Sequence, residues 1–170
     1  MSCSNMERTE EIAMNLEDTA VEELLNYLQN DQPEIRELAT AELWRRWFLQ
    51  MGVAGYMQLQ LSQSLLDDGL VEKAEAVLTD LLTDLPNFAE AWNRRAILYY
   101  SQGNYQKSLQ DCEQVVKLVP YHFGAWHGMG LCHTALGSYR AAIRAFRKAL
   151  EIQPYALANQ RLILECSAML

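Results

Sequence analysis

The side chains that most often perform catalysis are scattered along this chain and form no recognisable reactive pair. Its three histidines stand apart from any serine or cysteine in a nucleophile motif: they are His122, His127 and His133. Two adjacent acids, Asp67 and Asp68, precede Gly69 and are typical of a solvated turn, whereas acid–base catalysis needs paired groups in a cleft. No glycine-rich loop follows a strand pattern, so the sequence has no phosphate-binding motif. The sequence therefore predicts no catalytic residue and no enzyme activity.

The positions of the cysteines disfavour metal chemistry. Cys3, Cys112, Cys132 and Cys166 show no paired spacing, whereas a structural zinc site needs four clustered nitrogen or sulfur ligands. Cys132 and His133 are neighbours in the sequence and therefore point to different sides of a helix. We expect no metal site and no cofactor, with Cys112 and Cys132 filling the core as reduced thiols.

Composition limits the location of the protein and the class of its partner. No apolar stretch reaches the ~18 residues that span a bilayer, and the polar, acidic N-terminus lacks a secretory-signal pattern. We therefore expect a cytoplasmic protein without membrane insertion. The formal net charge of −8 repels a phosphate backbone and argues against nucleic acid as a partner. Residues 1–88 carry 17 acids and 5 bases, and residues 89–170 carry 5 acids and 9 bases, a polarity that leaves head-to-tail association open.

The elements that hold these side chains repeat with a fixed period. Four residues recur 34 positions later: Trp92, Gly103, Tyr105 and Pro120 return as Trp126, Gly137, Tyr139 and Pro154. Trp92, Ala96 and Tyr99 share one face of a first helix, and Gly103 ends that helix because glycine readily adopts a left-handed conformation. Tyr105 begins the apolar stripe of a second helix, which Pro120 closes. The period therefore predicts stacked helix pairs with a continuous core, an arrangement that binds more often than it catalyses.

This pattern resembles the tetratricopeptide repeat, whose units carry a large residue, a small residue, a glycine, an aromatic residue and a proline at fixed positions. Residues 123–156 match all of these positions, and residues 89–122 depart only mildly. Residues 53–88 keep Gly69 and Pro86 but have Gln58 where the large residue belongs. The resemblance implies an all-α fold, a right-handed α-α superhelix of three repeats in a TPR-like solenoid.

Helical segments flank the predicted repeats on both sides. Residues 16–52 are typical of a helical hairpin broken at Asp31–Pro33, and the stretch from Asp31 to Leu43 resembles part of a HEAT repeat. We expect this hairpin to stack on the first repeat and cover its apolar face. Residues 157–170 form an unusually apolar capping helix, which packs on the last repeat or makes a dimer or partner contact. Residues 1–15 are expected to form a flexible tail.

In this family the first helices of the repeats line a concave groove that binds other proteins. The resemblance places eight residues in it: Leu59, Gln63, Asn93, Arg94, Ile97, Tyr100, His127 and Leu131. Two glycines on the third-repeat wall would leave room for bulky side chains or a helix. One subfamily binds the acidic C-terminus of heat-shock chaperones through a clamp built from lysine, asparagine and arginine. The clamp positions hold other residues here, so we expect no such clamp: they are Leu59, Gln63, Arg94, Gly124 and Gly128.

These features favour a non-enzymatic protein–protein interaction module, such as an adaptor, scaffold or assembly factor. Its partner would be a peptide or an amphipathic helix with an acidic residue opposite Arg94. Two alternatives remain open. One is a self-associating module that forms a homodimer through the apolar C-terminal helix or through its oppositely charged halves. The other is the regulatory subunit of an enzyme.

Overall fold

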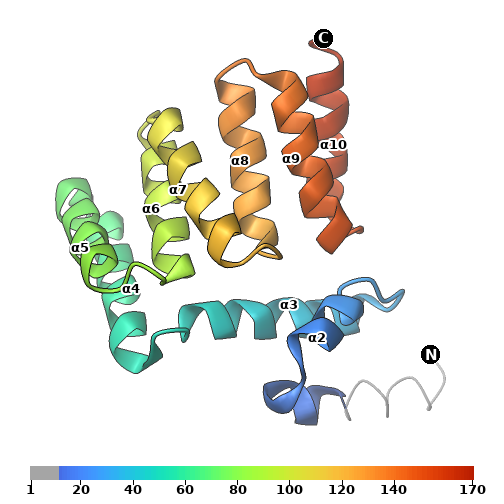
Figure 1. The fold of residues 1–170 in the computed structure, drawn as a ribbon, viewed down its shortest axis with the longest axis horizontal. Helices are drawn as coiled ribbons and strands as arrows, with labels where there is room; N and C mark the ends of the chain where they lie inside the picture. The colour runs from blue at the N-terminus through green and yellow to red at the C-terminus, as the bar shows by residue number, and fades with distance from the viewer. Residues whose placement is uncertain (1–11) are drawn as a thin grey trace.

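The described part of the chain is helical throughout. The computed structural model describes residues 12–170 and contains helices but no strand within that range (Figure 1). The predicted all-α class is confirmed. Most of the tail expected over residues 1–15 lies outside the described residues. The expectation of a loose tail is wrong for residues 12–15, which are helical, because Ile12 is only 9% exposed and shares a hydrophobic cluster with Leu16 and Trp47.

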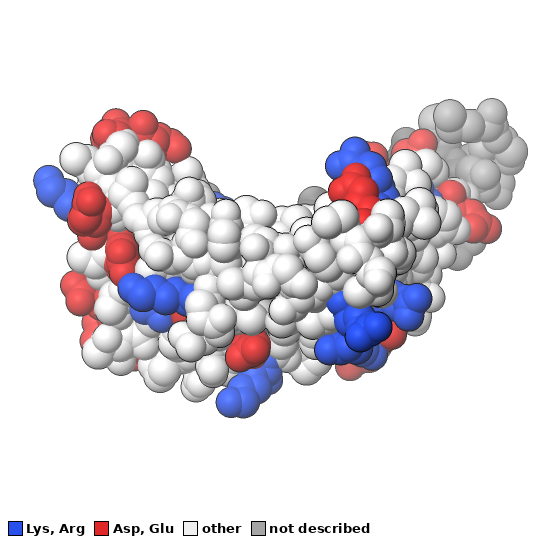
Figure 2. Space-filling view, turned by 90° about the horizontal axis from the view of Figure 1, so that it is seen from above, with Lys and Arg blue, Asp and Glu red and all other residues white. Residues whose placement is uncertain are grey.

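About two thirds of the chain, from α4 to the C-terminal helix, forms an array of stacked helices. They are α4 (Gly52–Asp67), α5 (Val71–Asp84), α6 (Ala89–Ser101), α7 (Tyr105–Leu118), α8 (Phe123–Ala135), α9 (Tyr139–Ile152) and α10 (Leu157–Ser167). Each helix packs against the next in sequence. The stacking bends the molecule into a crescent that is hollow on one side (Figure 2). This is the solenoid that the periodicity predicts.

Glycines end the first helix of each pair. Gly69, Gly103 and Gly137 have φ angles of 73°, 75° and 70°, a region that side chains other than glycine rarely adopt. The residue after each glycine then donates its backbone N–H to a carbonyl one turn back, as in the 2.9 Å bond from Asn104 N to Tyr99 O. The helix stop that the sequence predicts at Gly103 is confirmed.

One further glycine lets the two helices of a pair approach closely. Gly130 of α8 faces Phe146 of α9, and a Cβ atom built on Gly130 would lie 2.2 Å from the nearest ring atom. Phe146 is fully buried, so the ring has no free space into which it could move. The small residue expected at this position is therefore a packing requirement.

A hydrogen bond repeats from unit to unit and shows where α10 belongs. Trp92 Nε1 donates to the Pro86 carbonyl and Trp126 Nε1 donates to the Pro120 carbonyl, both at 2.8 Å. Gln160 of α10 makes the same bond to the Pro154 carbonyl at 2.9 Å. Thus α10 occupies the place of the first helix of a further pair.

The N-terminal segment lies along the array and does not stack on the first pair alone. After the short helices η1 (Leu16–Asp18) and α2 (Val21–Tyr27), helix α3 (Pro33–Phe48) passes beneath the lower ends of α6 and α8 (Figure 1). Its apolar face shares a buried cluster with the second and third pairs: Ile35, Ala39, Leu43 and Trp47 pack with Val115, Val119, Phe123 and Ala125. The segment packs on the array, but its contacts extend beyond the first repeat, because this face is long enough to cover successive inter-repeat turns.

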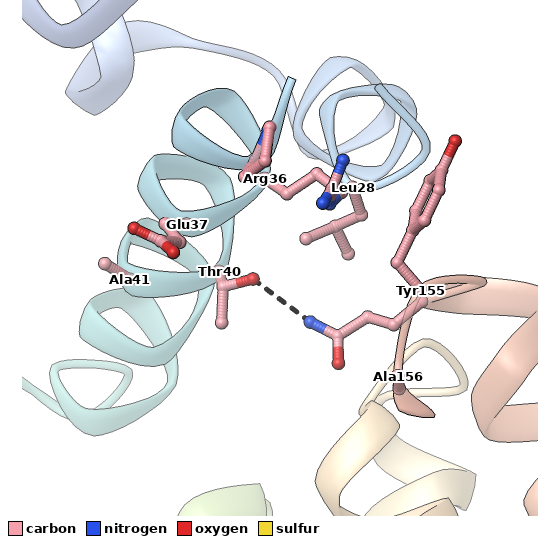
Figure 3. A pocket seen from close by; sticks show the side chains of 9 residues that line it. Leu28, Arg36, Glu37, Thr40, Ala41, Tyr155 and Ala156 are labelled. Carbon is pink, nitrogen blue, oxygen red and sulfur yellow. Dashed lines mark hydrogen bonds between the residues drawn. The ribbon is translucent and has the colours of Figure 1, made fainter. Parts of the chain in front are cut away.

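Both ends of α3 are attached to opposite ends of the array. Near its start, Tyr155 donates to Asp31 Oδ1 at 2.8 Å, and the Arg36 guanidinium lies 4.1 Å from the Tyr155 ring centroid. Gln153 donates to Thr40 Oγ1 at 3.1 Å (Figure 3). These residues border an open pocket of about 340 Å³ between α3 and the loop after α9. Beyond its end, the Gln50 side chain bonds the backbone at residues 87 and 89. Helix α3 therefore spans the array from its last pair to its first.

Candidate protein-binding groove

The hollow side of the crescent contains an apolar cavity of about 300 Å³. Figure 2, which views the crescent from its edge, shows few charged side chains in its middle. Five of the eight residues predicted for the groove line the cavity: Asn93, Ile97, Tyr100, His127 and Leu131. Gly124 and Gly128, the two glycines expected on the third-repeat wall, also line it. The sequence did not predict the other lining residues: Trp44, Ala96, Ser108 and Cys112.

Helix α6 supplies the apolar rim of the cavity. Ile97 is 54% exposed, although it sits on a helix whose neighbouring residues are largely buried. Tyr100 is half-buried, and this burial raises the pKa of its hydroxyl above the usual value. Its ring packs against Tyr105 at a centroid distance of 5.3 Å. An exposed aliphatic side chain beside a tyrosine is an arrangement common in surfaces that bind proteins.

The room left by the glycines of α8 is taken in part by side chains of the chain itself. A Cβ atom on Gly124 would lie 2.9 Å from the Trp44 ring, and one on Gly128 would lie 3.1 Å from Cys112 Sγ. Trp44 of α3 therefore closes one end of the cavity. Trp44 lies three residues before Trp47, which puts a second aromatic ring beside the apolar face of α3. This spacing is the signal in the sequence that indicates a packing role for Trp44.

The back wall consists of small polar side chains whose hydrogen bonds are made within the chain. Ser108 donates to the Ala96 carbonyl at 2.7 Å and accepts from the Cys132 thiol at 3.1 Å. Contact with the Cys132 thiol, together with burial, raises the pKa of Cys112 well above its usual range. A thiol held in its neutral form is a poor nucleophile. The packing role predicted for Cys112 and Cys132 agrees with their burial.

Arg94 is engaged inside the protein and is not a free cation in the groove. It donates to Glu90 Oε1 and to Gln63 Oε1, both at 3.0 Å, and its guanidinium lies over the Phe48 ring at 4.8 Å. Glu90 is fully buried, and a buried carboxylate requires a counterion. We expected an acidic residue of the partner opposite Arg94. In the structure, Glu90, one turn earlier on the same helix, already pairs with Arg94.

His122 is a further polar neighbour of the buried Glu90. Its Nδ1 accepts the Ala125 N–H at 3.1 Å at the start of α8, so its proton is placed on Nε2, which faces Glu90 Oε2 at 3.3 Å. The imidazole also stacks on Trp47 at a centroid distance of 4.0 Å. One histidine thus connects α3, α6 and α8 immediately below the cavity.

The remaining predicted groove residues, Leu59 and Gln63, lie outside the cavity. Leu59 is only 2% exposed and packs in a cluster with Leu78 of α5 and with Phe88, the residue before α6. Gln63 is half-buried and holds Arg94 on one side and Asp67 on the other. His127, which does line the cavity, is held by Asn159 Oδ1 at 2.6 Å from its Nδ1.

Other chemistry finds no support in the part of the chain that the structure describes. Among residues 12–170, no cluster of three or more histidine, cysteine, aspartate or glutamate side chains is arranged to hold a metal ion. His133, away from the cavity, has its pKa lowered by burial. Within the same range, no helix has the length and apolar character needed to cross a bilayer.

Comparison with known proteins now identifies the family. The family model for the tetratricopeptide repeat matches residues 87–154, which include α6–α9. Residues 87–154 belong to the tetratricopeptide repeat family. A TPR repeat-containing protein from Rhizobium etli is 34% identical over 110 residues, covering 62% of this chain and 54% of the relative. Tetratricopeptide repeat protein 37 from Xenopus laevis is 30% identical over 105 residues, covering 61% of this chain and 6% of the relative. The chain therefore corresponds to about half of the first relative and to a small part of the second.

Solved structures agree on the fold. The first TPR domain of Spaghetti (RPAP3), bound to an HSP90 peptide, aligns with a TM-score of 0.64 at 18% identity, covering 66% of this chain and 89% of that chain. The MamA structure aligns with a TM-score of 0.60 at 17% identity, covering 92% of this chain and 85% of that one. Identities this low establish the TPR-like architecture of the protein and nothing further.

Proposed function

We propose that this TPR protein is a non-enzymatic adaptor or scaffold whose concave groove binds a segment of another protein. The observation that carries the proposal is the apolar cavity of about 300 Å³ on the hollow side, with the exposed Ile97 at its rim. A preformed apolar cavity excludes water and gives a large side chain a place to bury its surface. The RPAP3 domain, which shares the fold, is described as bound to a peptide, and this supports a peptide ligand.

The anchor of the partner would be a bulky apolar side chain, carried on an extended peptide or an amphipathic helix. The cavity is lined mainly by carbon atoms and glycine backbone, so a charged group placed there would lose hydration without compensation. Arg94, the cation predicted for the groove, already pairs with Glu90. A partner carboxylate would have to compete with a buried one. We therefore place an apolar residue, and not an acidic residue, at the centre of the interface.

The test is a quantitative cross-linking and affinity-purification experiment with matched variants. Ile97→Asp puts a charge at the cavity rim, whereas Leu118→Asp puts the same charge on another exposed aliphatic residue, at the end of α7 and outside the cavity. We expect specific partners to be lost by at least about tenfold with Ile97→Asp, as for an interface hot spot, and retained with Leu118→Asp. A partner set unchanged by Ile97→Asp contradicts the groove as the binding site.

A further inference from the structure

Helix α10 continues the repeat register but presents a face that no other described helix covers. Gln160 makes the repeated bond to the preceding proline carbonyl, and Cys166 is buried like its counterpart Cys132 one period earlier. Leu164 occupies the position of Gly130, whose backbone meets Phe146 of the following helix. In α10 that position is 71% exposed. The face that a second helix covers in the preceding pair is therefore open here.

The open face is an apolar stripe with charges along one edge. Leu157, Leu164 and Ala168 follow a helical spacing that places them in one line, and all three are exposed. Arg161 and Glu165 lie together along one side of this line. They form an exposed pair one turn apart, with Arg161 Nε 3.3 Å from Glu165 Oε1.

We propose that this stripe is covered by α10 of a second copy of the chain, in an antiparallel pair about a two-fold axis. The argument is the self-complementarity of the charges. Arg161 and Glu165 are equally far from Ile163 along the helix. A two-fold axis near Ile163 therefore brings Arg161 of one copy opposite Glu165 of the other, twice, while the two copies of Leu164 meet beside the axis.

The ends of the stripe match in the same way. Leu157 and Met169 are also equally far from Ile163, and their exposed fractions are 74% and 61%. The axis places these two apolar side chains opposite each other across the interface. A parallel arrangement would set arginine against arginine and glutamate against glutamate, which is unfavourable. The sequence of α10 thus favours one relative orientation, as a symmetric contact requires.

The test measures the molar mass of the full chain in solution by sedimentation equilibrium over a range of concentrations. We expect a reversible monomer–dimer equilibrium for the wild type and a dissociation constant raised at least about tenfold for Leu164→Glu. The control Leu136→Glu makes the same change at another exposed leucine, in the turn after α8, and should leave the equilibrium unchanged. A wild type that stays monomeric at the highest concentration overturns the proposal, as does equal weakening by the control.

Charge reversal then tests the geometry directly. Arg161→Glu and Glu165→Arg each place like charges opposite one another, so each should weaken the dimer by about tenfold, equivalent to about 1.4 kcal/mol. The double variant Arg161→Glu/Glu165→Arg restores opposite charges and should restore the wild-type constant. A double variant that remains as weak as the single ones overturns the antiparallel arrangement. Ile97→Asp lies on another surface and should not change the mass, which separates this proposal from the groove.

Discussion

At the scale of single residues, the close crossing of α8 and α9 depends on the absence of one methyl group. Replacing glycine with alanine inside a helix usually stabilises a protein by about 1 kcal/mol. At Gly130 the added Cβ would overlap the buried Phe146 ring, with 2.2 Å between them, and overpacking of a core costs about 1–3 kcal/mol. The free-energy cost of this overlap is therefore larger than the stabilisation gained from the higher helix propensity of alanine.

We predict that Gly130→Ala lowers the free energy of unfolding by about 1–3 kcal/mol, measured by urea denaturation. Phe146→Leu removes part of the ring that the new methyl group meets. The double variant Gly130→Ala/Phe146→Leu should therefore be more stable than the sum of the two single changes predicts. Additive effects, or a stabilised Gly130→Ala, would contradict the close contact.

A second residue-scale prediction concerns the charge pair below the cavity. Arg94→Met keeps the aliphatic stem but leaves the fully buried Glu90 without its cation. We expect the free energy of unfolding to fall by about 2–4 kcal/mol, because an unpaired buried charge is costly. Adding Glu90→Gln should recover most of the loss in the same denaturation assay. A stable Arg94→Met protein would instead indicate that Arg94 is available to a partner.

At the scale of helices, the sequence predicted the repeated elements well because their signals are local. Gly103 and Pro120 mark the ends of α6 and α7, and the same residues one period later mark α8 and α9. The small residue at Gly130 also follows from the repeat position alone. Each of these features depends on residues within one period, which a sequence pattern can reveal.

The path of α3 could not be predicted in the same way. Its position depends on Trp44 meeting Gly124 and on Trp47 stacking against His122, and such distant contacts leave no periodic signal in one sequence. For the same reason, only some of the groove residues could be predicted. Ile97 and Leu131 follow from repeat positions, but the burial of Leu59 and the internal engagement of Arg94 depend on what packs above them.

At the scale of the whole molecule, α3 changes how the array should unfold. In a simple solenoid each repeat contacts only its neighbours, so the ends can unfold independently. Here α3 joins the last pair to the first through contacts at Tyr155, His122 and Gln50. This connection should make residues far apart in the array unfold together.

We predict that Trp47→Ala uncouples the ends of the array as well as destabilising it. Removing a buried indole costs about 3–5 kcal/mol, and hydrogen exchange measured by mass spectrometry should then show α9 and α10 exchanging faster than α6 and α7. In the wild type we expect α6–α9 to exchange with similar protection. Tyr121→Ala, which removes a half-buried ring near Trp47, serves as the comparison and should leave the protection uniform. Uniform acceleration in Trp47→Ala would contradict the coupling.

The position of Trp44 has a practical consequence for finding the ligand. Trp92 and Trp126 are fixed by hydrogen bonds to proline carbonyls, and Trp47 is stacked on His122, whereas Trp44 alone among the tryptophans lines the cavity. Indole fluorescence depends on the polarity around the ring, so a side chain that displaces water there will alter the emission of this one fluorophore. The fluorescence emission of Trp44 therefore reports whether the cavity is occupied, and candidate peptides can be titrated without any label.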